Sequence, residues 1–585
     1  MLSVHSNWLL AFAITAAVLD PAAAGTTVRP LPNIVMFLTD DQDQMLGGSF
    51  PAHDGATPMP KTKAKMQDAG AMATNFFIHT PICCPSRSEL VTGRYLHNLK
   101  TDPTLPKQKD EIICMHVNET KVNGHTFAVP LAKAGYKVGL FGKYLNNMPA
   151  NHAAPPGFDA WMGNGGGDYI APAFDTAGLA DIGPWHIPDG RWATTEANYT
   201  TAVVGNVSIA WIEKTVAAGD PFFAYIAPKA AHEPFIPAPW YLEHWDPSWP
   251  KTEPRNDPAW NSTADARAGH HGNIATQPML SEEAAQVITG VFKNRWRTLM
   301  SVDDVIGSVI DKCEALGVLN NTYFFYSSDH GFQLGQLNII MDKRHVYDWD
   351  TRIHLLARGP GIAAGSTWAQ PATQVDLAPT FLGIAGLDKT AVMDGKSLLP
   401  LLLAARGDTE LGAPAAATVH PATARHLASL GDATAYASAW RDAAYIEYYY
   451  VAANVKCVEQ CTTPGGKYPH SDSWCTDLPD NSKCWGPPCK QDCYPTEDQD
   501  NNFIGLRSMP GSALGDTLYV EFQHGNADQG PVNFSASSIN FHEVYDVAAD
   551  KWQMHNLYNS TAPATLQAMH TKLHAFFDCA GDACP

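Results

Sequence analysis

Four short apolar runs in the first 330 residues predict the buried strands of a parallel sheet. They are Ile34–Thr39, Lys137–Phe141, Pro221–Ala227 and Thr322–Ser327. Each run is nearly continuous in apolar residues rather than alternating, which is typical of strands covered on both faces. The segments between them are long enough for helical crossovers, for example Pro60–Ala69 and Phe292–Leu316. This alternation predicts an α/β domain with a mainly parallel central sheet flanked by helices.

The pattern changes after residue 400. From about Leu403 to Ala439 the chain is rich in Ala, Gly, Thr and Pro, which indicates a connection between domains. Apolar runs that predict strands follow at Tyr445–Tyr450, Thr517–Phe522 and Glu543–Asp546, and Met554–Phe577 contains a closing helix. We therefore expect a main domain over residues 25–425 and a smaller α+β domain with an antiparallel sheet over residues 426–585.

The amino terminus has the pattern of a signal peptide. The apolar run Trp8–Leu19 is too short to span a bilayer comfortably, and the small residues Ala22–Ala24 follow it. Residues 1–24 are the predicted signal peptide, and no later stretch predicts a membrane span. Glycosylation sequons agree with export, and they begin at Asn118, Asn198, Asn206, Asn261, Asn320, Asn533 and Asn559.

Cysteine usage also favours an oxidising compartment. Six of the twelve cysteines fall between Cys457 and Cys493, and Cys579 and Cys584 close the chain. These clusters predict disulfides, with a cysteine-rich insertion at about 457–493 whose connectivity cannot be deduced from sequence. A zinc site at Cys457-x3-Cys461 is the weaker alternative, because it needs a partner pair and a reducing setting.

The formal net charge of −20 argues against nucleic-acid binding, which favours a basic face. It does not exclude an anionic substrate, because a site can be locally positive inside an acidic protein.

Chemically active side chains follow each of the four predicted strands. In chain order they are Asp40 and Asp41, Lys143 after Gly142, His232, and Asp329 with His330. Ligands of open α/β sheets bind beyond the carboxyl ends of the strands, so we expect these residues to form one site. The three aspartates are hard oxygen ligands suited to calcium or magnesium, and His330 adds a ring nitrogen. The plainer alternative is that Asp40 and Asp41 only cap the next segment.

The segment from Pro81 to Arg94 predicts a short helix with a cysteine at its start. Pro85 suits the first turn and Gly93 the end. Cys83 then lies at the helix N-terminus, where free N–H groups and the helix dipole favour an anion. A buried cysteine pair, one half of a disulfide, or an activated thiol nucleophile are the alternatives.

The motif Cys83-x-Pro85-Ser86-Arg87, followed by Thr92-Gly93-Arg94, resembles the signature of the sulfatase family. The resemblance continues through most of the mature chain, in the segments Thr39–Asp43, Gly142–Asn146, Arg297–Asp304, Ser328–Gly331, Asp342–Arg344, Arg358–Gly361 and Glu543–Asp546. Within the family, the chain is most similar to the N-acetylglucosamine-6-sulfatase branch, with secreted algal arylsulfatases close behind.

The resemblance implies an alkaline-phosphatase-like fold and a sulfuric ester hydrolase. A separate formylglycine-generating enzyme would oxidise Cys83 to formylglycine, and hydrolysis would pass through a covalent sulfo-enzyme intermediate. One divalent ion per chain, Ca²⁺, would be held by Asp40, Asp41, Cys83, Asp329 and His330.

The resemblance also implies roles for the remaining site residues. Arg87 would steady the nucleophile and the metal site, while Lys143 and Lys343 would neutralise the sulfate oxygens. His232 would hydrogen-bond the bridging oxygen or protonate the departing alcohol. Leu145 replaces a second histidine found in many sulfatases, so proton transfer would depend more on His232. Many relatives carry asparagine where this chain has His330.

The expected substrate is a sulfated sugar, such as N-acetylglucosamine 6-sulfate in a glycosaminoglycan, or an aryl sulfate. Two segments are expected at the rim of the pocket, the loop at about 235–285, with His270 and His271, and the cysteine-rich insertion. Alternatives are a broad-specificity arylsulfatase, a phosphoester or phosphonate hydrolase on the same scaffold, and an inactive carbohydrate-binding relative. Secretion, a cell wall and a lysosome-like compartment fit the export signals equally.

Overall fold

A ten-stranded sheet forms the centre of the computed structural model, in the order β10-β2-β8-β7-β1-β6-β3-β4-β5, with β9 paired to β2. The structure describes residues 30–45, 55–100, 117–146, 153–185, 190–407, 410–411, 419–450, 454–457, 493–527 and 532–585. The strands are β1 (Asn33–Thr39), β2 (Ala71–Phe77), β3 (Lys137–Lys143), β4 (Ala160–Asn164), β5 (Asp175–Ala177), β6 (Phe222–Ala227), β7 (Thr322–Ser328), β8 (Arg352–Arg358), β9 (Ser366–Trp368) and β10 (Ala372–Thr373).

The four strands predicted from the sequence are confirmed as β1, β3, β6 and β7. They are neighbours in the order β7-β1-β6-β3, and all three pairings are parallel. Strand β1 lies between β6 and β7, so that Val35 is opposite both Ala224 and Phe324. Beyond β7 the sheet changes direction, because β8 pairs antiparallel with both β7 and β2. The predicted sheet lacked β2 and β8.

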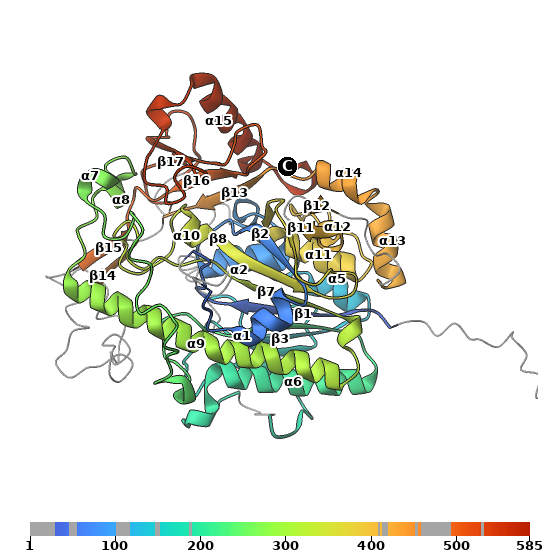
Figure 1. The fold of residues 1–585 in the computed structure, drawn as a ribbon. Coiled ribbons are helices and arrows are strands. Elements are labelled where there is room, and N and C mark those ends of the chain that lie inside the picture. Colours follow the sequence, from blue (N-terminus) through green and yellow to red (C-terminus); the bar gives the residue numbers. More distant parts are fainter. Residues whose placement is uncertain are drawn as a thin grey trace, which may run out of the picture. The chain divides into compact units, whose positions relative to one another are not determined.

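Helices cover both faces of this sheet (Figure 1). They include α2 (Cys83–Thr92) and α11 (Leu377–Ile384) on one face, and α6 (Thr200–Ala218) and α9 (Glu282–Ala315) on the other. Alternate side chains of β1 enter the two hydrophobic cores: Met36 lies in the core that contains Leu90 of α2, and Phe37 in the core that contains Leu299 of α9. A strand buried on both faces explains the continuous apolar run in its sequence.

The two segments expected as helical crossovers are helical, with differences in extent and type. Helix α9 begins ten residues before the predicted Phe292, at Glu282, where the Ser281 side chain accepts a hydrogen bond from the Ala284 amide. Pro60–Ala69 forms the single turn α1 (Pro60–Thr62) and a π-helix over Lys63–Gln67. Other short elements are α3 (Leu96–Leu99), α4 (Glu119–Asn123), α5 (Ala128–Lys133), α7 (Ala264–Arg267), α8 (Gly272–Ala275), α10 (Asp348–Thr351), β11 (Ala405–Gly407) and β12 (Glu410–Leu411). Among the residues that the structure describes, no helix combines the length and apolarity needed to cross a bilayer.

A second sheet of four antiparallel strands lies in the C-terminal part of the chain (Figure 1). Its order is β13-β16-β17-β18, with β13 (Ala443–Tyr448), β16 (Phe503–Ser508), β17 (Thr517–Phe522), β18 (Phe541–Asp546), and the helix α15 (Pro563–Phe577) follows. The three predicted strands and the closing helix are confirmed, and β16 was not predicted. The predicted connection begins at the end of α12 (Leu399–Ala404) and contains helices α13 (Pro421–Ser429) and α14 (Ala433–Ser438). One hydrophobic core includes residues from both sheets, and the domain boundary at residue 425 stays a prediction.

The predicted signal peptide lies outside the described residues, as does the cysteine-rich insertion apart from its edges. Those edges are paired as β14 (Asn454–Cys457) and β15 (Cys493–Glu497). Cys579 and Cys584 form a disulfide, as their position in the sequence predicts. Cys84 is also disulfide-bonded, whereas Cys83 and Cys313 are free and buried.

Candidate active site

The predicted site residues meet at the carboxyl edge of the four parallel strands. Asp40 and Asp41 follow β1, Lys143 ends β3, and Asp329 follows β7. His232 lies in the loop after β6, and its exposed side chain fraction of 22% places it at the edge of this otherwise buried group. The neighbouring positions of β7, β1, β6 and β3 bring these strand ends together.

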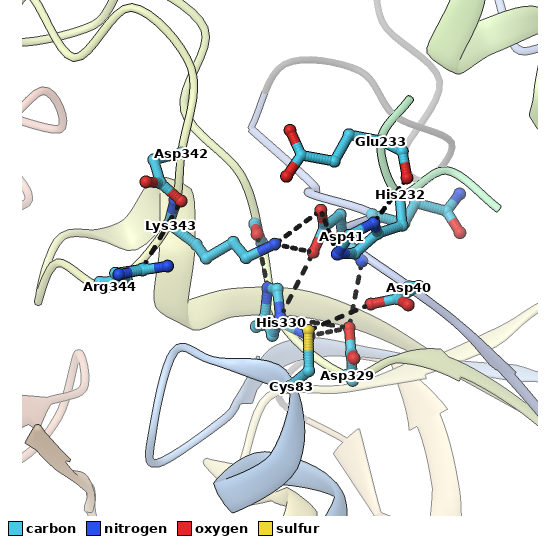
Figure 2. A network of polar contacts seen from close by, with 12 residues as sticks. Asp40, Asp41, Cys83, His232, Glu233, Asp329, His330, Asp342, Lys343 and Arg344 are labelled. Atoms are coloured by element: carbon cyan, nitrogen blue, oxygen red, sulfur yellow. Dashed lines mark hydrogen bonds and ion pairs between the residues drawn. The ribbon is translucent and has the colours of Figure 1, made fainter. Parts of the chain in front are cut away.

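Helix α2 brings Cys83 to the same edge. The helix begins at Cys83 and ends at Gly93, whose φ of 67° is the left-handed cap that glycine adopts without strain. Cys83 is free and 1% exposed. Its Sγ lies 3.4 Å from Asp40 Oδ1 and 3.4 Å from His330 Nε2 (Figure 2). The alternatives in which Cys83 is half of a disulfide are therefore wrong for this structure.

Four of these residues could hold a metal ion. Asp40, Asp41, Cys83 and His330 each offer one ligand atom, and these atoms lie within 4.8 Å of one another. Asp329 is adjacent, since its Oδ1 lies 3.6 Å from His330 Nε2, but it is not in this mutually close set. Its Oδ1 accepts hydrogen bonds from the backbone amides of Asp41 at 3.1 Å and His330 at 2.9 Å.

Three cations balance the three buried carboxylates. Lys143 Nζ lies 2.5 Å from Asp40 Oδ2, and Lys343 Nζ lies 2.7 Å and 2.8 Å from the two oxygens of Asp41. Arg87 Nε donates to Asp329 Oδ2 at 2.8 Å. Because buried charges are costly unless they are paired, these contacts offset the cost of burying the three acids.

Arg87 spans the middle of this array. Its Nη1 donates to the backbone carbonyl of Lys143 at 3.0 Å, and its Nη2 lies 3.7 Å from Asp40 Oδ2. Nη2 is buried and makes no hydrogen bond within the described protein atoms. Arg87 therefore links the ends of β1, β3 and β7, and its Nη2 remains able to donate a further hydrogen bond.

The charges of the site determine its protonation. Burial alone would raise the pKa of Asp40, but Lys143 and the other cations hold it well below its usual range. Burial likewise opposes ionisation of Asp41, and Lys343 lowers its pKa. The pKa of Asp329 is raised by burial and by the neighbouring charge of Asp40. The carboxylates next to Cys83 are thus kept anionic by lysines.

His232 presents one ring nitrogen to the site. Its Nδ1 lies 2.8 Å from the carbonyl oxygen of Glu233, so Nδ1 carries the proton in the neutral ring, and Nε2 faces Asp41 Oδ2 at 4.0 Å (Figure 2). Burial lowers the pKa of His232, but the charge of Asp41 outweighs this and raises it. When the ring is protonated, its Nε2–H is directed toward Asp41.

Comparison with known proteins agrees with this arrangement. Residues 32–387 match the sulfatase family. The chain belongs to that family. It is a sulfuric ester hydrolase, and it is 30% identical over 572 residues to the N-acetylglucosamine-6-sulfatase of Homo sapiens, which covers 96% of this chain and 87% of the relative.

Two further comparisons concern an algal relative and a solved structure. The chain is 30% identical to an arylsulfatase of Volvox carteri over 398 residues, which are 62% of this chain and 57% of the relative. A solved structure described as a complex with its substrate D-glucosamine-2-N,6-O-disulfate superposes with a TM-score of 0.58 at 22% identity, and covers 93% of this chain and 97% of that one. The fold of this sulfatase is therefore the alkaline-phosphatase-like fold that the resemblance implied.

Sequence reasoning missed two residues that shape the site of this sulfatase. Arg295 Nη2, from α9, donates to the Asp41 carbonyl at 2.6 Å and to Asp43 Oδ1 at 2.8 Å, and so fixes the turn after β1. Gly142 has a φ of 113°, and a Cβ there would lie 2.0 Å from the Ala227 carbonyl oxygen. Gly142 allows β3 to approach β6 closely just before Lys143. Arg295 acts partly and Gly142 wholly through backbone atoms, and such roles leave little pattern in a sequence.

The predicted rim histidines are elsewhere. His270 and His271 are buried, and they bind the carbonyl of Gln553 and the carboxylate of Glu543. They attach the 235–285 loop to the C-terminal sheet, so these two histidines face the interior, and the position of the loop at the rim stays a prediction. Arg344 is next to Lys343 in the chain, and its Nη1 donates to Glu497 Oε2 at 2.5 Å.

Replacing Arg87 by leucine is expected to lower the free energy of unfolding by about 3–5 kcal/mol, because Asp329 would stay buried without its cation. Denaturant midpoints of the two proteins measure the loss. Arg425→Leu is the control, since Arg425 is exposed on α13. Equal midpoints for wild type and Arg87→Leu would contradict the central role of this ion pair.

Proposed function

We propose that this sulfatase removes the 6-sulfate of glucosamine-type sugars, with a formylglycine made from Cys83 as nucleophile and one Ca²⁺ as metal. The observation that carries the proposal is the position of Cys83. Its sulfur, which stands in for the formylglycine oxygen, is at the start of a helix and 3.4 Å from both Asp40 and His330.

The residues present fit both groups. Carboxylate oxygens from Asp40 and Asp41 are the donors that Ca²⁺ prefers, and Asp329 lies close enough to complete an oxygen-rich set. Cys83 is a free thiol beside these ligands rather than half of a disulfide. When bound, the ion supplies Lewis acidity and formylglycine supplies the attacking oxygen.

The two lysines bind the sulfate group. In the present structure Lys143 and Lys343 pair with Asp40 and Asp41, the same carboxylates that the metal needs. A bound cation would take over those carboxylates, and each ammonium group could then turn on its flexible stem toward the sulfate oxygens. Arg87 is held by Asp329 and by the carbonyl of Lys143, so it keeps its position at the carboxyl edge of the sheet.

His232 gives the leaving alcohol its proton. The Glu233 carbonyl orients the ring, and Nε2 faces the cluster from its more exposed side, where the sugar leaves. A general acid at this point contributes most when the leaving group is a poor one such as a sugar hydroxyl.

The choice of substrate is supported by two relatives. The human relative is named an N-acetylglucosamine-6-sulfatase, and the superposed structure is a complex with D-glucosamine-2-N,6-O-disulfate. We also propose that the protein acts outside the cytosol. Asparagines of three sequons, Asn320, Asn533 and Asn559, are exposed, which suits glycosylation during export.

Cys83→Ala is expected to abolish release of sulfate from N-acetylglucosamine 6-sulfate, because it removes the nucleophile. The protein should come from a host with a formylglycine-generating enzyme, and peptide mass spectrometry across Thr80–Arg94 should find formylglycine at position 83. An active Cys83→Ala variant, or a wild-type Cys83 left unmodified beside a modified control sulfatase, would contradict the proposal. Faster turnover of the matching phosphate ester would favour a phosphoesterase instead.

His232→Ala is expected to lower kcat about 10²–10⁴-fold on the sugar sulfate, where the departing alcohol needs a proton. The loss on p-nitrophenyl sulfate should be much smaller, because that leaving group departs as a stable anion. Steady-state kinetics on both substrates give the comparison. Equal losses on the two substrates would show that His232 does not protonate the leaving group.

Asp41→Asn is expected to weaken Ca²⁺ binding about tenfold or more, because it removes a charged ligand. Calorimetric titration of chelator-treated protein should give one Ca²⁺ per wild-type chain. Asp311→Asn, at an exposed aspartate of α9, should bind as the wild type does. Unchanged affinity in Asp41→Asn would remove Asp41 from the ligand set.

A further inference from the structure

A second group of metal-ligand side chains lies far along the chain from the catalytic residues, between β17 and α15. His570 and His574 are one turn apart on α15, and Glu521 is on β17. His570 Nδ1 lies 2.6 Å from Glu521 Oε1, and His574 Nε2 lies 2.8 Å from Glu521 Oε2. The two imidazole rings are 4.2 Å apart between centroids. Both elements belong to the C-terminal sheet region in Figure 1.

The three groups have the chemistry of a transition-metal site. One nitrogen from each imidazole and one carboxylate oxygen lie within 4.8 Å of one another. Two histidines at positions i and i+4 with a carboxylate form a common three-ligand set for zinc, which leaves a fourth position for water. Ligand atoms around a tetrahedral zinc are roughly 3.3 Å apart. The two nitrogen–oxygen contacts of 2.6 Å and 2.8 Å would therefore each have to lengthen to admit the ion.

The surroundings of the cluster suit a ligand set. Glu521 is fully buried, and the Tyr519 hydroxyl donates to its Oε1 at 2.7 Å, which orients the carboxylate as outer hydrogen bonds do in metal sites. Burial raises the pKa of Glu521, but hydrogen bonds from His574, Tyr519 and His570 outweigh it and keep the carboxylate ionised. His570 and His574 are 36% and 22% exposed, so an ion can enter from solvent.

We propose that Glu521, His570 and His574 bind one Zn²⁺ ion, which fastens α15 to the C-terminal sheet. Imidazole nitrogens favour zinc over the hard ion of the catalytic site, so the two sites take different metals. No residue of the proposed catalytic mechanism takes part, and the inference therefore stands or fails independently of the proposed function. The competing state is a pair of histidine–glutamate hydrogen bonds without metal.

The test uses full-length protein without a histidine tag. After chelation, the protein is dialysed against Zn²⁺ with excess Ca²⁺ to occupy the catalytic site, and bound zinc is counted by mass spectrometry of the metal. Wild type is expected to hold one zinc more per chain than His570→Ala, His574→Ala or Glu521→Gln. His555→Ala is the matched control, because His555 is 82% exposed and also lies next to a carboxylate, that of Asp550.

Thermal midpoints with and without Zn²⁺ give a second readout, because an ion that binds only the folded state stabilises it. Zinc should raise the midpoint of wild type and of His555→Ala and leave the three site variants unchanged. Sulfatase turnover in Ca²⁺ shows that each variant is folded. Equal zinc content in wild type and in folded site variants, or no zinc-dependent midpoint shift in wild type, would overturn the proposal.

Discussion

The structure depends on one electrostatic constraint, the neutralisation of three buried aspartates at the carboxyl edge of the sheet. Asp40, Asp41 and Asp329 are each fully buried, and each is paired with a cation from a different element. Those partners come from β3, the loop after β7 and α2, so the charge balance ties together segments that are far apart in the sequence. If these segments were not held together, the aspartates would be buried without partners, at a large cost in desolvation.

The sequence predicted the parts of the fold whose cause is local. A strand covered on both faces needs a continuous apolar run, and β1, β3, β6 and β7 have one. Strand β8 was missed although it has a neighbour on each side. Its antiparallel pairing with β7 and β2 is set by tertiary structure and not by the pattern of its own residues. The start of α9 was missed although Ala284, Val287 and Ile288 are apolar and buried, and the side chain of Ser281 caps the helix there.

The residues of the candidate site also differ in whether their cause is local in the sequence. Residues next to strand ends, such as Asp40, Lys143 and Asp329, could be found from their positions alone. Lys343 rested on family resemblance, because it lies in a loop whose path is set by tertiary contacts, and the structure brings it to Asp41. Arg295 could not be recognised from the sequence, because one of its contacts is to a backbone carbonyl. His270 and His271 were expected at the rim but are buried, because a pair of histidines in a long loop can face either the interior or the pocket.

If Cys83 is converted to formylglycine as proposed, its burial has a consequence for when that conversion can take place. With 1% of its surface exposed, the thiol cannot be reached by another enzyme once α2 is packed in place. Any enzyme that oxidises Cys83 must therefore act on the nascent or unfolded chain, before the sheet edge closes over it. Activity would then be decided during biosynthesis, and a correctly folded molecule that missed this interval could not be repaired later without unfolding.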